Sequence, residues 1–173
     1  MKIKHFALYC AAALGASAAS LPALADTATG SMDVQIIITA NCTVSGSTNT
    51  LDFGSNPSTS TDASANNGGF SVTCSNMTPY SIGLKSTATG ALDDGAGVMS
   101  TTAPGVTQTI GYQLYQDAGF GTAWGNSTTG TVNTKAGTGT GAAQPYTVYG
   151  KTTTSLNVPA ATYKDTVAIN VYY

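Results

Sequence analysis

The sequence is poor in the side chains that most enzymes use for catalysis. It has no arginine and no glutamate, and its single histidine is His5, within the first 25 residues. A general acid–base pair or a nucleophile–base pair would therefore have to be built from aspartates and lysines alone. The absence of histidine from the rest of the chain also disfavours a zinc-type metal site. We expect a protein that is not an enzyme and that carries no cofactor.

Charge is also scarce. Only 8% of the residues are charged, whereas about a quarter is usual in soluble domains. Beyond residue 25, four lysines and eight aspartates remain, which gives a net charge of −4. This balance argues against nucleic acid and anionic membrane surfaces as partners. A surface of Ser, Thr, Gly and Asn does little to repel a second copy of the chain.

The first 25 residues have the pattern of a secretory signal peptide. Two lysines precede an apolar run from Phe6 to Ala19, and Ala23–Ala25 has the small-x-small pattern of a cleavage site. The run is too short to span a membrane, and no later stretch approaches a span. We expect residues 1–25 to be removed during export to the periplasm, leaving Asp26 as the first mature residue.

Removal of the leader leaves two cysteines, Cys42 and Cys74. In an exported chain such a pair is expected to form a disulfide. It would close a loop of about 33 residues, which the chain-entropy model values at roughly 3.5–4 kcal/mol of stability.

The mature chain shows no helical periodicity of useful length. Short apolar runs alternate with Gly, Asn, Ser and Thr, which predicts an all-β sandwich or barrel. The expected extended segments are residues 29–39, 42–44, 51–54, 69–74, 80–85, 98–99, 110–116, 146–151 and 163–173. The intervening stretches, including 56–69, 120–130 and 138–143, are expected to be loops.

Residues 29–39 are the most regular of these segments. One face carries Gly30, Met32, Val34, Ile36 and Ile38, and polar residues occupy the other face. Strict alternation predicts a half-buried strand. Two interpretations compete: an ordinary first strand that pairs within its own domain, or a strand inserted into the sheet of a neighbouring molecule.

The end of the chain bears on that choice. Residues 163–173 also alternate, with Val167, Ile169, Val171 and Tyr173 on the same face as Tyr163. No later strand is available to pair with the outer edge of this segment. Because a bare apolar edge promotes aggregation, another part of the molecule or another copy must cover it.

Several short motifs occur in a characteristic order between Gly30 and Tyr173. They are GSMDV at 30–34, CTV at 42–44, LDFG at 51–54, SVTC at 71–74, YQLYQD at 112–117, WG at 124–125, VYG at 148–150 and YKDTV at 163–167. In these motifs and its two cysteines the chain resembles the spore coat protein U domain, the fold of subunits in archaic (Csu-type) chaperone–usher pili.

The resemblance implies an incomplete immunoglobulin-like β-sandwich that lacks its seventh strand. A periplasmic chaperone would fill the open groove first, and the N-terminal strand of another subunit would replace it at an outer-membrane usher. The implied organisation is a signal peptide at 1–25, a donor strand at 26–40 and a pilin domain at 41–173.

The resemblance also implies roles for particular residues. The donor residues would be Gly30, Met32, Val34, Ile36 and Ile38. The groove and the chaperone contact would involve Val167, Ile169, Val171 and Tyr173. The implied function is a structural subunit of a surface pilus, joined head-to-tail to copies of itself or related pilins, that supports attachment and biofilm formation. A spore coat protein and a monomeric surface-binding module are the alternatives.

Three further features have a functional and a plainer interpretation. Residues 93–95, Asp-Asp-Gly, could bind a cation, but a solvated turn is expected because such sites need six or more oxygen ligands. Trp124, Tyr112 and Tyr115 could stack on a sugar, but packing in the sheets is expected. Asp165 is expected to form a weak surface pair with Lys164.

Overall fold

The computed structural model describes residues 26–46 and 50–173. The predicted signal peptide lies outside the described residues. The chain divides into two units, Met1–Ile37 and Ile38–Tyr173. Strands are the only regular secondary structure in the described part, and no helix there could cross a lipid bilayer.

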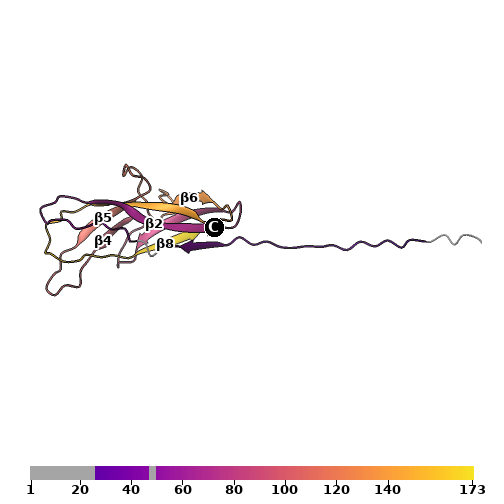
Figure 1. Ribbon diagram of the computed structural model, residues 1–173, viewed down its shortest axis with the longest axis horizontal. Coiled ribbons are helices and arrows are strands. Elements are labelled where there is room, and N and C mark those ends of the chain that lie inside the picture. Colours follow the sequence, from indigo (N-terminus) through magenta and orange to yellow (C-terminus); the bar gives the residue numbers. More distant parts are fainter. Residues whose placement is uncertain (1–25, 47–49) are drawn as a thin grey trace, which may run out of the picture. The chain divides into compact units, whose positions relative to one another are not determined.

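The second unit contains eight strands in two antiparallel sheets (Figure 1). The five-stranded sheet has the order β1-β2-β7-β5-β4, and the three-stranded sheet has the order β6-β3-β8. Their bounds are β1 Cys42–Ser45, β2 Ser64–Cys74, β3 Pro79–Ser86, β4 Ala96–Met99, β5 Ile110–Tyr115, β6 Lys135–Thr138, β7 Gln144–Thr152 and β8 Val167–Tyr172. The predicted all-β sandwich is confirmed.

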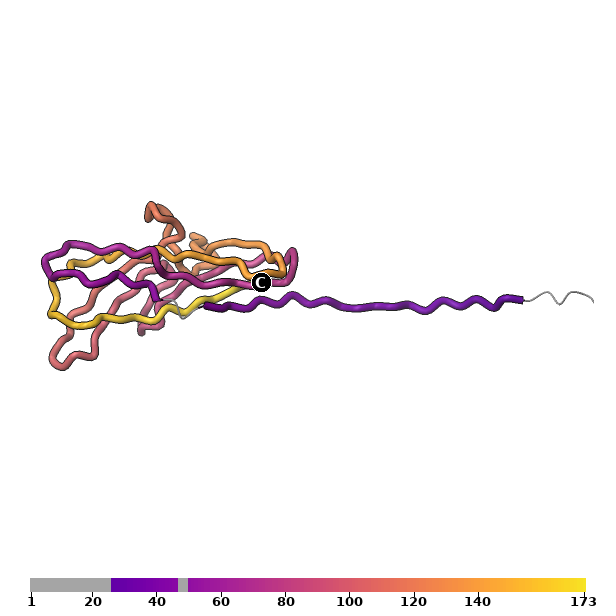
Figure 2. The backbone as a smooth tube through the Cα atoms, viewed as in Figure 1, coloured from indigo at the N-terminus to yellow at the C-terminus, as the bar shows by residue number. Residues whose placement is uncertain are grey.

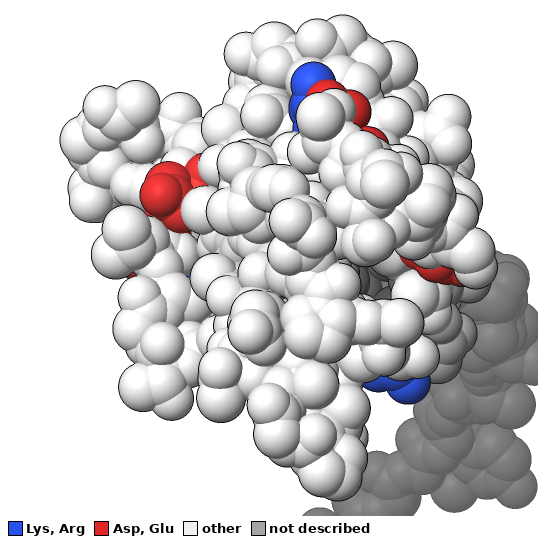
Figure 3. Space-filling model, turned by 90° about the vertical axis from the view of Figure 1, so that its left-hand side faces the viewer, with Lys and Arg blue, Asp and Glu red and all other residues white. Residues whose placement is uncertain are grey.

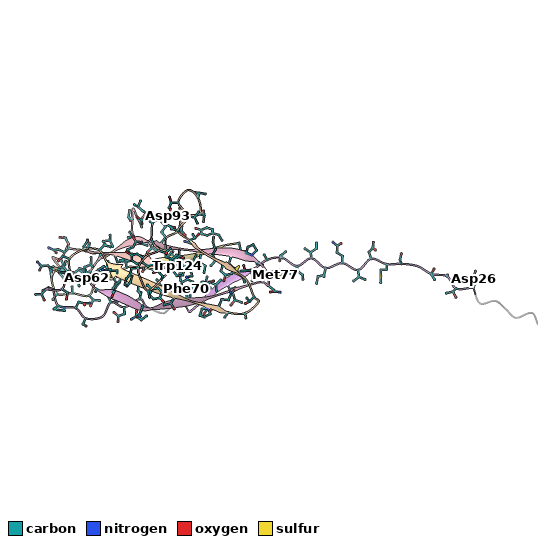
Figure 4. All side chains as sticks on the ribbon, turned by 90° about the horizontal axis from the view of Figure 1, so that it is seen from above. Asp26, Asp62, Phe70, Met77, Asp93 and Trp124 are labelled. Carbon is teal, nitrogen blue, oxygen red and sulfur yellow. A yellow bond between two sulfur atoms is a disulfide. The ribbon has the colours of Figure 1, made fainter. Side chains whose placement is uncertain are left out.

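The core lies between the two sheets and follows from the alternation of the central strands. In β2 the side chains of Phe70, Val72 and Cys74 are buried, whereas the residues between them are partly exposed. Phe70 and Trp124 lie in the interior in Figure 4, with ring centroids 5.9 Å apart. Each large apolar side chain buried in this way contributes about 1.5–3 kcal/mol.

The predicted disulfide is present and lies at one edge of the five-stranded sheet. Cys42 is directly opposite Cys74 in the antiparallel pair of β1 and β2, and the sulfur atoms are 2.04 Å apart. The disulfide therefore ties the short first strand to the long second strand.

Several predicted boundaries are wrong. Residues 51–54 form no strand, and β2 begins at Ser64, inside the predicted loop 56–69. β6 was not expected, because its sequence, KAGT, has no alternating apolar residues. β8 begins at Val167 rather than 163, since Lys164 instead forms an isolated bridge with Ser100.

The N-terminal segment forms no strand. Residues 26–40 have no regular secondary structure, and their side chains are exposed. Figure 2 traces an extended chain here, and the side chains in Figure 4 project alternately to two sides. This contradicts the interpretation of residues 29–39 as an ordinary first strand paired within its own domain.

Candidate acceptor groove

An open groove of about 1080 Å³ runs between the two sheets of the second unit. Its walls come from segments far apart in the sequence, because both sheets and two long connections contribute. The apolar lining includes Phe53, Leu84, Leu114, Val148, Val167 and Ile169. A pocket of this size is at the upper end of those that hold whole small ligands.

The groove lies beside β8, whose second edge is unpaired. Among the described strands, β8 pairs only with β3. The backbone groups on the other edge of β8 are therefore available to another strand.

The four residues predicted for this site do not all reach the groove. Val167 and Ile169 are among its lining residues, whereas Val171 and Tyr173 are not. Val171 packs against the core, and Tyr173 lies beyond the end of β8 with 61% of its surface exposed. The structure therefore brings together the first two of these residues at the groove.

A carboxylate is held at the end of the groove where β8 begins. Asp165 Oδ2 accepts hydrogen bonds of 2.7 Å from Ser86 Oγ and from Tyr112 Oη. Burial, followed by the hydrogen bond to Asp165, raises the pKa of Tyr112, so the phenol stays protonated and donates. Because Tyr112 belongs to β5 and Ser86 to β3, this carboxylate links the two sheets.

The sequence of the sandwich matches one protein family. Residues 28–170 match the Spore Coat Protein U domain. The chain belongs to this family. The resemblance inferred from its motifs is thus confirmed over most of the sequence.

Other comparisons add little to the family assignment. No curated protein matches this spore coat U domain. One solved structure with a similar chain is the CsuC–CsuE chaperone–tip adhesion subunit pre-assembly complex from archaic chaperone–usher Csu pili of Acinetobacter baumannii. That chain is 19% identical, with a TM-score of 0.46, and the alignment covers 79% of this chain and 40% of the other. The spore coat U domain protein thus spans less than half of that chain.

Asp93 and Asp94 of the spore coat U domain both make contacts within the chain. Asp93 forms an ion pair of 3.0 Å with Lys85. Hydrogen bonds from Lys85 and Asn126 lower the pKa of this aspartate. The side chain of Asp94 accepts a hydrogen bond from the backbone of Ala96. The contacts of these two carboxylates within the chain favour the plainer interpretation of residues 93–95 as a turn. No cluster of three metal-ligating side chains occurs among residues 26–46 and 50–173.

The expected packing in the sheets is confirmed for Trp124 and Tyr112, so these two buried rings are not available to stack on a sugar. Trp124 is completely buried, and its Nε1 donates a 2.9 Å hydrogen bond to the carbonyl of Ile82. Its backbone nitrogen donates to the carbonyl of Leu114. Trp124 therefore connects β3 to β5, and Tyr112 is buried beside the same core.

The expected surface pair of Asp165 with Lys164 is wrong. The ion pairs in the described part of the chain join Lys85 to Asp93 and Lys151 to Asp62. Asp165 is bound by hydroxyl groups instead. The sequence could not predict this arrangement because Ser86 and Tyr112 lie on different strands, and both are more than 50 residues from Asp165.

Replacing Tyr112 by phenylalanine should lower the free energy of unfolding by about 1.5 kcal/mol. This is the low end of the range for hydrogen bonds to charged groups, because Asp165 is only half-buried. Urea denaturation would measure the change. Tyr115→Phe is the matched control, since Tyr115 lies on the opposite face of β5 and is partly exposed. Equal losses in the two variants would contradict a specific bond to Asp165.

Proposed function

We propose that this protein is a structural subunit of an extracellular fibre, in which the N-terminal segment of one copy fills the groove of the next. The observation that carries the proposal is the unpaired edge of β8 beside an apolar groove. The same chain supplies a segment, residues 30–38, with the alternating pattern that such an edge requires. Strand addition provides backbone hydrogen bonds, and pockets for alternate side chains provide specificity.

The apolar side chains of the N-terminal segment are suited to this role. Met32, Val34, Ile36 and Ile38 have 78–87% of their surface exposed. Burying all four would contribute a gross gain of about 6–12 kcal/mol, and each backbone hydrogen bond would add modestly. Gly30, at the start of the pattern, has no neighbouring atom within 4 Å of an added Cβ, so its use would be to allow a close backbone approach in the complex.

The positions of the strand ends favour one direction for the inserted strand. β1 begins at Cys42, opposite Cys74. β8 ends near the same end of the sandwich, because Tyr172 pairs with Ser81, just after the turn that follows Cys74. The start of β1, which follows the donor segment in the sequence, therefore lies at the end of the sandwich where β8 ends. An incoming donor antiparallel to β8 would leave at the opposite end.

Antiparallel insertion therefore allows each subunit to accept the donor strand of one neighbour and to insert its own donor strand into another neighbour. A parallel donor would bring both neighbours to one end, where their bodies would compete for space. Contacts of this head-to-tail kind do not close on themselves, so they generate fibres. The scarcity of charge on the end face in Figure 3 is compatible with such stacking.

The route of assembly follows from the family resemblance. After export directed by residues 1–25, a periplasmic chaperone would cover the β8 edge, with Val171 and Tyr173 as further contacts. An outer-membrane usher would then exchange the chaperone for the donor strand of the next subunit. The fibre would end on the cell surface, where we propose a role in attachment and biofilm formation rather than in catalysis.

A synthetic peptide of residues 28–40 should bind the mature chain and block its self-association. The mature chain alone should form oligomers that grow with concentration, whereas excess peptide should keep it monomeric with one peptide bound. At a peptide concentration a hundred times Kd, the free energy of unfolding should rise by about 2.7 kcal/mol. Size-exclusion chromatography with light scattering and thermal unfolding would measure both effects.

A peptide with Gln35 and Ile36 exchanged is the matched control. It has the same composition, but the exchange interrupts the alternation, so it should bind weakly. A mature chain that stays monomeric at high concentration and binds neither peptide would overturn the proposed function.

A further inference from the structure

Residues 51–54 line the groove although they form no strand. Leu51 and Phe53 are partly buried and pack against the core. Both are also lining residues of the groove, as are Val167 and Ile169 of β8. The groove is therefore bounded on one side by a regular strand and elsewhere by an irregular segment.

Two glycines of the five-stranded sheet make room for this segment. A Cβ atom at Gly150 would lie 2.7 Å from Leu51 Cδ2 and 3.0 Å from Phe53 Cζ. A Cβ atom at Gly68 would lie 3.0 Å from Leu51 Cβ. Leu51 and Phe53 thus lie directly on the backbones of β2 and β7, where any larger residue would displace them.

One side chain replaces the backbone pairing that residues 51–54 lack. Asn67 Oδ1 accepts a 2.9 Å hydrogen bond from the backbone nitrogen of Asp52. Asn67 Nδ2 donates a 3.0 Å hydrogen bond to the carbonyl of Asp52. The carboxamide is the neutral side-chain group that can donate and accept in this way. The side chain of Asn67 therefore pairs with both backbone groups of Asp52, as the backbone of a neighbouring strand would.

The backbone of β2 is irregular at this point. The register between β2 and β7 shifts between Ala65 and Gly68. Such irregularities turn a side chain away from its usual direction in the sheet. The irregularity thus contains the residue, Asn67, that reaches residues 51–54.

We propose that Asn67 is a positioning residue that holds Leu51 and Phe53 as a wall of the groove, and that this wall controls how long a donor strand from a second copy stays bound. The inference rests on the proposed function. Donor side chains that enter the groove would contact Phe53 on one side and Ile169 on another. Because the carboxamide of Asn67 makes both hydrogen bonds that tie the backbone of Asp52 to β2, loosening it should affect donor retention more than the stability of the sandwich.

The test uses Asn67→Asp, which replaces a donor by a carboxylate oxygen of nearly the same size. The carboxylate would face the carbonyl of Asp52, so one hydrogen bond becomes a repulsive contact. Asn66→Asp is the matched control, because it adds the same charge to the neighbouring exposed residue of β2. Both are made in the mature chain with its own donor disabled by Ile36→Asp, so that only the added peptide fills the groove.

The dissociation rate of a fluorescent peptide of residues 28–40 should rise about tenfold or more in Asn67→Asp and less than twofold in Asn66→Asp. Amide hydrogen exchange in residues 50–56 of the free acceptor should accelerate in the first variant only, while β5 and β7 keep their protection. If near-ultraviolet circular dichroism shows Asn67→Asp to be unfolded, Asn67→Ala, which removes both bonds without adding charge, replaces it.

The outcomes separate the two proposals. If the parent acceptor fails to bind the peptide, the proposed function is wrong. If the parent binds but the Asn67 and Asn66 variants release the peptide at equal rates, the donor proposal stands and the positioning role of Asn67 is overturned.

Discussion

Replacing Ile36 by aspartate should abolish fibre assembly and leave the folded domain unchanged. Ile36 is 81% exposed and takes part in no strand pair, so the free subunit loses nothing. In the fibre the variant forfeits about 1.5–3 kcal/mol of apolar burial. It also brings an unpaired carboxylate into an apolar groove, which costs several kcal/mol more. A total of about 4 kcal/mol or more weakens donor binding at least a thousandfold.

The neighbouring substitution Gln35→Asp is the control for charge. It adds the same group to the opposite face of the extended segment, which would stay in solvent, so its fibres should form at nearly the normal rate. Electron microscopy and light scattering of the purified mature chains would distinguish the two. Equal assembly by both variants would contradict the assignment of the apolar face as the donor face.

A mixing experiment extends this test. The Ile36→Asp subunit should still receive a normal donor, since its own groove is intact. It should therefore terminate growing fibres, and average fibre length should fall as its fraction rises. If the variant were simply misfolded, it would be excluded and fibre length would stay constant.

The sequence predicts those strands whose residues alternate on their own. In β5, Ile110, Tyr112 and Leu114 are buried, as the period of two requires. In β6 the period is missing, and the strand exists because of its neighbour. The ring of Tyr80 on β3 covers Gly137, where an added Cβ would lie 2.5 Å from Cζ of the tyrosine. A strand that depends on a glycine beneath an aromatic ring on another strand leaves no local signal.

Residues 51–54 alternate as a strand does but form no strand. Leu51 and Phe53 alternate with Asp52 and Gly54, and this pattern predicted a strand. The alternation is real, since both apolar side chains face the core. The pairing partner is a carboxamide rather than a strand, however, and only the folded backbone places Asn67 there.

The candidate site, too, has parts that the sequence predicts and parts that only the folded structure shows. The donor segment was predictable because its pattern is contained in one continuous stretch, although its use stays a prediction. The groove was predictable only at Val167 and Ile169, which belong to the last strand. Its other walls include Met99 of β4 and Leu156 of the connection between β7 and β8, and the positions of both depend on the whole fold. The signal that could have pointed to Asn67 is its place beside Gly68, a common mark of irregular strands.

Removing both cysteines, as Cys42→Ala with Cys74→Ala, should lower the free energy of unfolding by about 3.5–4 kcal/mol. The expected loss is large because β1 has only four residues and pairs only with β2. Its other ties near this point are backbone and hydroxyl hydrogen bonds between Asn41 and Ser75. The shift in the urea midpoint at constant slope would measure the loss.

Reduction of the unmodified chain provides the control for this variant. With a thiol reductant, the wild-type midpoint should fall to that of the double variant, whereas the variant itself should not respond. An unchanged midpoint in the double variant would show that β1 is held without the disulfide.

The disulfide should also affect the mechanical strength of a fibre, because tension on the donor segment enters the domain at Asn41. With the disulfide intact that tension passes directly to β2, and without it a four-residue edge strand has to carry the load, so reduced fibres should break at lower force.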